Sequence, residues 1–245
     1  MFNYSASTIK GSTRKVNEDR IMINKQLLTG GTVQGKTQDS IIAVVCDGVG
    51  GESGSDVAAE IAAGYYSNIE INYLSALDVS RTVNKVNRII IKEQKKASKY
   101  YNMATTLAGI IIADNYYYIF GAGDTQIYRV CGNTLSVYNF NRAYYVRNSQ
   151  ENTLVRYLGG DGNACFPTVY RGYDFDRHSC YLICSDGIYR NIDDSEIKGI
   201  LESSISTENK EKAILQLALQ HGSTDDMSIV VLEKTEIETI PLKVH

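Results

Sequence analysis

Short apolar runs and amphipathic stretches alternate along this chain of 245 residues. In the first third, apolar runs of strand length predict three strands, over Phe2 to Ile9, Arg20 to Leu28 and Ile41 to Cys46. Apolar residues then recur every three or four positions, which predicts helices. One helix follows a polar start at Ser53 to Asp56, and a longer one runs from Val79 through Ile90 towards Tyr101.

The strand pattern returns in the second half at closer spacing. Turn residues separate four short apolar runs, over Thr106 to Ala113, Tyr116 to Ala122, Thr125 to Val130 and Thr134 to Tyr138. Tight turns between consecutive strands predict an antiparallel meander. A polar stretch follows from Asn139 to Asn163. The pattern then predicts a strand, two helices and a last strand, over Tyr181 to Ser185, Asp193 to Ser203, Glu208 to Gln220 and Met227 to Glu233.

The order of these elements predicts the fold class. Pairs of helices alternate with groups of strands, which indicates layered α+β packing with sheets buried against helices. The chain has only two prolines, so no rigid linker divides it. We therefore expect a single domain over residues 1–236 and a short C-terminal extension over 237–245.

Composition and charge narrow the classes of function. A net charge of -3 provides no basic surface for nucleic acid or for a membrane. The N-terminus lacks the cationic start and apolar core of a signal peptide, and no apolar stretch is long enough to span a bilayer, which predicts a cytoplasmic protein. The five cysteines form no C-x-x-C pair, so we expect buried thiols rather than disulfides or zinc ligands. We also expect a monomer.

The candidate chemistry lies in five short acidic motifs. They read Arg14-x-x-Asn17-Glu18-Asp19-Arg20, Val44-Val45-Cys46-Asp47-Gly48-Val49-Gly50-Gly51, Gly121-Ala122-Gly123-Asp124, Cys184-Ser185-Asp186-Gly187 and Thr224-Asp225-Asp226-Met227-Ser228. Four of the motifs place a carboxylate at or beside the end of an apolar run. Carboxylate oxygens bind hard divalent cations, and motifs at strand ends can bring several of them together. Each motif alone is common, since Asp-Gly also occurs in ordinary turns, but their ordered set predicts a metal centre.

The order and wording of the motifs resemble the metal-dependent, type 2C (PPM) family of serine/threonine protein phosphatases. Thr105-Thr106-Leu107 matches a further step of the family pattern, and the resemblance runs from about Thr8 to Leu232. It implies a four-layer α-β-β-α sandwich of two antiparallel sheets flanked by helices. It also implies hydrolysis of phosphoserine and phosphothreonine on proteins by a metal-activated water. The cofactors would be two Mn²⁺ or Mg²⁺ ions, with a third, weaker ion as in bacterial members. The expected partners are phosphorylated proteins and a cognate serine/threonine kinase.

The resemblance assigns metal ligands within the motifs. Asp47 would bridge two ions, with the carbonyl of Gly48 as a further ligand. Glu18 would bind one ion, while Asp186 and Asp225 would bind the other. Asp226 remains the alternative to Asp225, because both are acidic and adjacent.

Three further residues receive supporting roles from the same resemblance. Asp19 would support a water at the metal, and Asp124 would share the third ion with Asp186. Arg14 would bind the substrate phosphate, because a planar guanidinium can donate to two phosphate oxygens at once. An arginine that merely pairs with a surface carboxylate is the alternative interpretation of Arg14.

The sequence departs from the family pattern at positions that concern substrate more than metal. Val49 stands where some members carry a histidine proposed as a general acid, so a water would have to protonate the departing oxygen. Thr125-Gln126 replaces the common Ser-Arg after Gly-Asp. The flap between Tyr138 and Leu158 is shortened and lacks an acidic-His element. The three histidines, His178, His221 and His245, lie outside the motifs, and we expect structural or surface roles for them.

Two other functions fit parts of the sequence. Gly30 to Thr37 matches the phosphate-binding string G-x-x-x-x-G-K-[ST] of nucleotide hydrolases. Such a loop must open a helix, and only three residues separate Thr37 from the next predicted strand, so we interpret the segment as a hairpin turn. The second alternative is a phosphoprotein-binding module that keeps the fold with little activity, which the shortened flap would favour.

Overall fold

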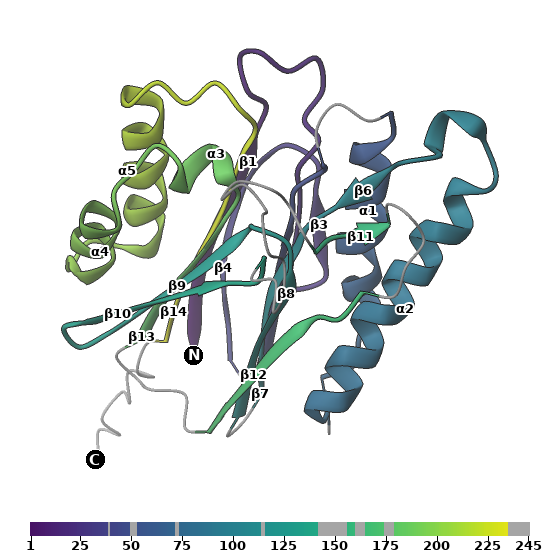
Figure 1. The fold of residues 1–245 in the computed structure, drawn as a ribbon. Coiled ribbons are helices and arrows are strands. Elements are labelled where there is room, and N and C mark those ends of the chain that lie inside the picture. The colour runs from purple at the N-terminus through teal and green to yellow at the C-terminus, as the bar shows by residue number, and fades with distance from the viewer. Residues whose placement is uncertain are drawn as a thin grey trace, which may run out of the picture.

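The structure is a computed structural model that describes residues 1–38, 40–49, 53–71, 74–113, 116–141, 156–159, 165–173 and 179–234. Two six-stranded antiparallel sheets lie face to face, and helices cover the outer face of each (Figure 1). The predicted α-β-β-α sandwich is confirmed.

The two sheets combine strands from distant parts of the sequence. Sheet A has the order β10 (Thr134–Asn139), β9 (Gln126–Cys131), β13 (Ser179–Cys184), β14 (Met227–Lys234), β1 (Phe2–Ile9) and β4 (Gly31–Thr37). Sheet B has the order β12 (Thr168–Tyr173), β8 (Tyr116–Ala122), β7 (Leu107–Ala113), β5 (Ser40–Cys46), β2 (Arg20–Ile23) and β3 (Gln26–Leu28). A separate short pair joins β6 (Ala104–Thr105) to β11 (Leu158–Gly159). Pairing of β1 with β14, from Phe2 opposite Lys234 to Ile9 opposite Met227, joins the two ends of the described chain in the middle of sheet A.

Helices form the two outer layers. Sheet B is covered by α1 (Ser55–Tyr65) and α2 (Ala76–Gln94), with short 3-10 turns η1 (Tyr66–Asn68) and η2 (Ser98–Tyr100) after them. Sheet A carries α3 (Asp186–Tyr189), α4 (Asp194–Glu202) and α5 (Thr207–Gln220). α2 starts with a capping box, in which the side chains of Ser75 and Asp78 each accept the other's backbone N–H.

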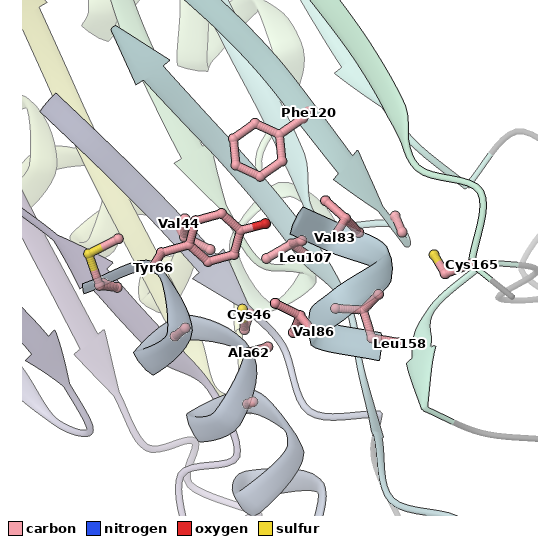
Figure 2. Close-up of a cluster of buried hydrophobic side chains, with 14 of the residues drawn as sticks. Val44, Cys46, Ala62, Tyr66, Val83, Val86, Leu107, Phe120, Leu158 and Cys165 are labelled. Carbon is pink, nitrogen blue, oxygen red and sulfur yellow. The ribbon is translucent and has the colours of Figure 1, made fainter. Parts of the chain in front are cut away.

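The core explains why β5 reads as an unbroken apolar run. Successive side chains of a strand point to opposite faces, so Val44 packs under α1 and α2 while Val45 packs between the two sheets. Both faces of β5 are therefore buried away from water, so the strand does not need a polar residue at every second position. In the helix-covered layer, the rings of Tyr66 and Phe120 stack with centroids 5.5 Å apart (Figure 2).

The prediction of one strand over Arg20 to Leu28 is wrong. The segment folds back on itself as a β2–β3 hairpin, with Ile21 opposite Leu28. Asn24 and Lys25 at the turn have φ values of 47° and 69°, in the left-handed region. Asn tolerates this region better than most residues, but without a glycine the sequence gives a weak turn signal.

The prediction of a four-strand meander is also wrong. β7 and β8 pair in sheet B, whereas β9 and β10 pair in sheet A, so the chain changes sheets between Ala122 and Gln126. Gly123 makes this passage with φ 112°, and a Cβ there would lie 2.6 Å from the Cβ of Thr106. Similarly, α2 ends at Gln94 and does not continue to Tyr101. The predicted turn at 114–115 lies outside the described residues.

The segment that resembles a nucleotide-binding loop is an edge strand. Gly31–Thr37 form β4, paired with β1, so the interpretation as a hairpin turn is wrong. After Thr37 the chain enters β5 at Ser40 and no helix begins there. Without a helix N-terminus facing the loop, the segment lacks the geometry of a phosphate-binding loop.

Three remaining expectations concern other parts of the chain. The five cysteines are free thiols and four of them are buried, as predicted. Most of the shortened flap, over 142–155, lies outside the described residues. Among the helices that the structure describes, none combines the length and the apolar character needed to cross a membrane.

Candidate metal centre

The acidic motifs meet at one end of the sandwich. Asp47 follows β5, Asp124 follows β8, Asp186 begins α3, and Asp225 lies just before β14. Glu18 and Asp19 lie in the β1–β2 loop, which rises above that end (Figure 1). Neighbouring strands of an antiparallel sheet run in opposite directions, so the first residues of some strands and the last residues of others lie at the same edge. Motifs from the whole chain can therefore converge there.

Asp47 is held in place by its backbone. Its N–H donates to Thr106 Oγ1 at 3.0 Å, and its carbonyl accepts from Thr106 N–H at 2.8 Å and from Thr105 Oγ1 at 2.9 Å. Thr106 Oγ1 in turn shares a 2.6 Å hydrogen bond with Thr125 Oγ1. The Thr-Thr pair of the motif set therefore positions Asp47, and Thr125 preserves that hydroxyl contact.

Gly48 is required by the close approach of another chain segment. A Cβ at this position would lie 2.8 Å from the carbonyl oxygen of Glu18 and 2.9 Å from the Cβ of Ser55. Glu18, Gly48 and the start of α1 are therefore in close contact, and a side chain at position 48 would push Glu18 away from Asp47.

Asp19 lies under the site rather than on its surface. Its side chain is 1% exposed, and its Oδ2 accepts a 2.8 Å hydrogen bond from Ser185 Oγ. Ser185 Oγ also accepts from Ser228 N–H at 2.9 Å, so this hydroxyl connects two of the acidic motifs to a third. Burial raises the pKa of Asp19 to about 7.

The structure separates the two adjacent aspartates near the C-terminus. Both oxygens of Asp226 accept backbone N–H groups, from Gly11 at 2.8 Å and from Glu18 at 2.8 Å, and the residue is 4% exposed. Asp226 therefore ties the β1–β2 loop to the start of β14. Asp225 faces the other carboxylates and acts electrostatically on Asp47 and Asp186.

In this cluster the negatively charged form of Asp47 is strongly disfavoured. Burial raises its pKa well above the usual range, and the negative charges of Asp19, Asp186, Asp124 and Asp225 raise it further, in that order. Burial likewise raises the pKa of Asp186, against the opposing effect of Arg190. A partly buried carboxylate that is crowded by four others needs positive charge nearby to remain ionised at neutral pH.

Two arginines supply part of that charge. Arg14 donates from Nε to Asp225 Oδ1 at 2.6 Å and from Nη2 to Oδ2 at 2.9 Å, and its Nη1 lies 3.3 Å from Glu18 Oε2. These contacts raise the pKa of Arg14. Burial acts to raise the pKa of Asp225, but the hydrogen bonds from Arg14 and other donors leave it lowered. Arg14 thus pairs with carboxylates, the alternative interpretation of this residue, with its guanidinium fork at the edge of the cluster.

Arg190 is the second arginine and was not singled out from the sequence. Its Nη2 lies 3.2 Å from Asp124 Oδ2 and 3.1 Å from Asp186 Oδ2. The Asp186 to Arg190 spacing of one helical turn was a signal available in the sequence, since residues four apart on a helix are neighbours. Its contact with Asp124 depends on tertiary structure.

The donor chemistry fits divalent cations. Five aspartates and a glutamate supply only oxygen ligands, which suit Mg²⁺ and Mn²⁺. Over the described residues, no three acidic, histidine or cysteine side chains already form a closed ligand set, and Arg14 and Arg190 lie between several of the carboxylates. Two arginines offset only part of the negative charge around Asp47, and an added cation would neutralise the remainder.

Of the described residues, His221 and Val49 take no part in the cluster. His221 lies on the surface after α5, where its Nδ1 is 2.7 Å from the carbonyl oxygen of Asn191. His178 and His245 lie outside the described residues. Val49 donates its N–H to the carbonyl of Ala104 at 2.9 Å.

Solved structures share the fold. A crystal structure of the serine/threonine phosphatase Stp1 from Staphylococcus aureus superposes with a TM-score of 0.80 at 19% identity, covering 96% of each chain. The Mycobacterium tuberculosis serine/threonine phosphatase PstP superposes with a TM-score of 0.78 at 20% identity, covering 96% of this chain and all of that one.

Sequence comparison identifies the family. The serine/threonine phosphatase stp of Listeria welshimeri is 26% identical over 248 aligned residues, covering 93% of this chain and 94% of the relative. The family model described as protein phosphatase 2C matches residues 25–157, which is more than half of the chain. This protein therefore belongs to the protein phosphatase 2C family.

Proposed function

We propose that this phosphatase hydrolyses phosphoserine and phosphothreonine on proteins at the acidic cluster around Asp47. The observation that carries the proposal is that Asp47, which is partly buried, is crowded by the negative charges of four other carboxylates at one end of the sandwich. Without bound cations, either some of these carboxylates would have to be protonated or their negative charges would repel one another. The family membership supports a phosphatase chemistry at this place.

We propose the ligand assignment that the family resemblance implies. Asp47 and the carbonyl of Gly48 would bind two ions, with Glu18 as a further ligand of one ion and Asp186 and Asp225 as ligands of the other. Asp19 supports the group from below through Ser185, and Asp124 lies beside Asp186. We propose two Mn²⁺ or Mg²⁺ ions, with a third held by Asp124 and Asp186.

Divalent ions bound there would lower the pKa of water and neutralise phosphate oxygens, which is the chemistry needed for attack on a phosphate monoester. The chain's own contribution is to hold the ligands rigidly. The Thr105 and Thr106 hydroxyls fix Asp47, and Ser185 fixes Asp19. No nucleophilic side chain is required, and Val49 cannot donate a proton, so the proton for the departing serine or threonine oxygen comes from water.

Arg14 is proposed to orient the phosphate. Its fork already spans Asp225 and Glu18, and the same two N–H directions match two oxygens of a phosphate. The side chain is 31% exposed, so an incoming phosphate can reach it from solvent. Asp225 would then lose its hydrogen bonds with Arg14 and bind a divalent cation instead.

The setting of the activity is proposed as follows. Phosphorylated proteins are the substrates, and a cognate serine/threonine kinase is the opposing partner. We propose a cytoplasmic monomer with one domain over residues 1–236. The related phosphatases named above support the substrate class, since each is named for serine/threonine dephosphorylation.

The test compares the intact protein with Asp47→Asn. Release of phosphate from an aryl phosphate and from a phosphothreonine peptide is measured with Mn²⁺ and with a chelator. We expect Mn²⁺-dependent release by the intact protein and a loss of about 100-fold or more in Asp47→Asn. Asp78→Asn, an exposed carboxylate that caps α2 far from the cluster, is the matched control and should retain activity.

One result would favour the phosphoprotein-binding module instead. In that case the phosphothreonine peptide would bind in a Mn²⁺-dependent manner, measured by fluorescence anisotropy, while no phosphate is released. Binding without turnover by the intact protein would overturn the proposed hydrolysis.

A further inference from the structure

Arg190 makes a contact that the proposed chemistry does not use. It ends α3, one helical turn after Asp186, and it reaches across to Asp124 on the loop after β8. A single nitrogen, Nη2, lies 3.1 Å from Asp186 Oδ2 and 3.2 Å from Asp124 Oδ2. One positively charged group therefore contacts both carboxylates.

The charges around this contact favour such a cation. Asp186 lies beside the negative charges of Asp124 and Asp225, and the guanidinium of Arg190 is the positive charge that contacts both Asp186 and Asp124. The side chains of Asp124 and Asp186 are 19% and 17% exposed, whereas that of Arg190 is 55% exposed. Two sheltered carboxylates thus share one guanidinium that reaches them from the solvent side.

A divalent ion bound by Asp124 and Asp186 would need the same oxygens. Arg190 directly follows α3 in the chain, so its guanidinium always stays close to these carboxylates. An ion from solution must therefore displace it. The contacts of Arg190 with Asp186 and Asp124 are partly exposed to water, so they are weak, and ions at high concentration can displace the guanidinium.

We propose that Arg190 is a built-in cation that competes with divalent ions for Asp124 and Asp186 and so limits how many ions the cluster binds. The inference rests on the proposed function, because it takes the cluster to be a metal centre. It assigns to Arg190 the role of setting the metal requirement of the enzyme. In this proposal two ions fill the cluster at low concentration, and the third ion binds only when it displaces the guanidinium from Asp124 and Asp186.

Direct measurement of Mn²⁺ binding tests the inference without any activity assay. Equilibrium dialysis with metal counting, supported by titration calorimetry, gives the number and affinity of ions for the intact protein and for Arg190→Gln. We expect the weakest ion to bind ~5- to 10-fold more tightly in Arg190→Gln. Arg88→Gln removes an exposed arginine of α2 that donates to the Asn84 carbonyl, and this charge-matched control should bind Mn²⁺ like the intact protein.

A second variant locates the competition. Asp124→Asn removes one of the shared carboxylates, so Arg190→Gln combined with Asp124→Asn should lose the tightening. Arg190→Lys retains a positive charge that can still reach both oxygens, and its weakest ion should bind with an affinity between those of the intact protein and Arg190→Gln. Thermal melting of each metal-free variant shows that the fold is retained.

Three results would overturn the inference. Identical Mn²⁺ isotherms for the intact protein and Arg190→Gln would show that the guanidinium does not compete. Tightening that persists after Asp124→Asn would place the competition elsewhere. An unchanged isotherm together with a raised KM for the phosphothreonine peptide would show that Arg190 binds substrate instead. If the intact protein binds no Mn²⁺ at all, the proposed function itself fails, which is a different outcome from equal binding by both proteins.

Discussion

Asp226 provides the sharpest test of how the site is assembled. Its carboxylate is 4% exposed and accepts the N–H groups of Gly11 and Glu18, both at 2.8 Å. Asp226→Ala leaves these two donors without a partner in a space that the smaller side chain does not fill. A buried donor left unsatisfied costs about 1 to 3 kcal/mol, so the two together predict a loss of about 2 to 6 kcal/mol, at the lower end if water enters beside Glu18.

Such a loss is a large part of the whole stability of a domain, which is typically about 5 to 15 kcal/mol. Urea unfolding of the metal-free protein, followed by circular dichroism, is the assay. With a slope of ~3 kcal/mol per molar, the midpoint should fall by about 0.7 to 2 M. Asp226→Asn keeps one acceptor oxygen and should lose roughly half as much.

Asp225→Asn is the matched comparison. Asp225 is 37% exposed and pairs with Arg14, and an asparagine there can still accept the N–H of Asp226. We expect a stability loss below about 1 kcal/mol but weakened Mn²⁺ binding. Asp226→Ala with unchanged stability, or a larger loss in Asp225→Asn, would refute the division into a structural aspartate and a ligand.

Three further predictions test other parts of the structure. Gly48→Ala places a Cβ 2.8 Å from the Glu18 carbonyl oxygen, so calorimetry should show Mn²⁺ affinity lowered ~10-fold or more, and normal affinity would contradict the close approach. Burial raises the pKa of Glu211, and its Oε1 has no hydrogen-bond partner. The native state therefore holds this proton more tightly than the unfolded chain, and stability falls as pH rises above about 4.5. Glu211→Gln should thus be more stable than the intact protein at pH 8 by ~1 kcal/mol, with a smaller difference at pH 4, and an equal difference at both values would argue against a buried charge. Lys36→Ala on the exposed edge of β4 should change stability by less than about 0.5 kcal/mol and leave phosphatase activity intact, whereas nucleotide binding abolished by this change would revive the nucleotide-hydrolase alternative.

The sequence by itself determined most of the elements and indicated the candidate ligands. Apolar runs such as Ile41 to Cys46 predicted strands, and helical spacing predicted α1, α4 and α5 close to their observed bounds, whereas the helix predicted to reach Tyr101 ends at Gln94. These patterns are local, because strand and helix periods are written into neighbouring positions. The acidic motifs were equally legible, since each carboxylate follows or precedes an element that the pattern had already located.

The tertiary structure decided which elements share a sheet and which charges meet. Turn signals flank β8 and β9 as they do the other strands, yet the chain changes sheets between them. The two hairpins share the core between the sheets, but their outer faces pack in different helix-covered layers. The same holds for Asp225 and Asp226, whose roles differ only through Gly11, Glu18 and Arg14, more than 200 positions away in sequence. Arg190 gained its second carboxylate only when Asp124 was brought beside α3. Contacts of this kind depend on the packing of the whole chain, and no local period records them.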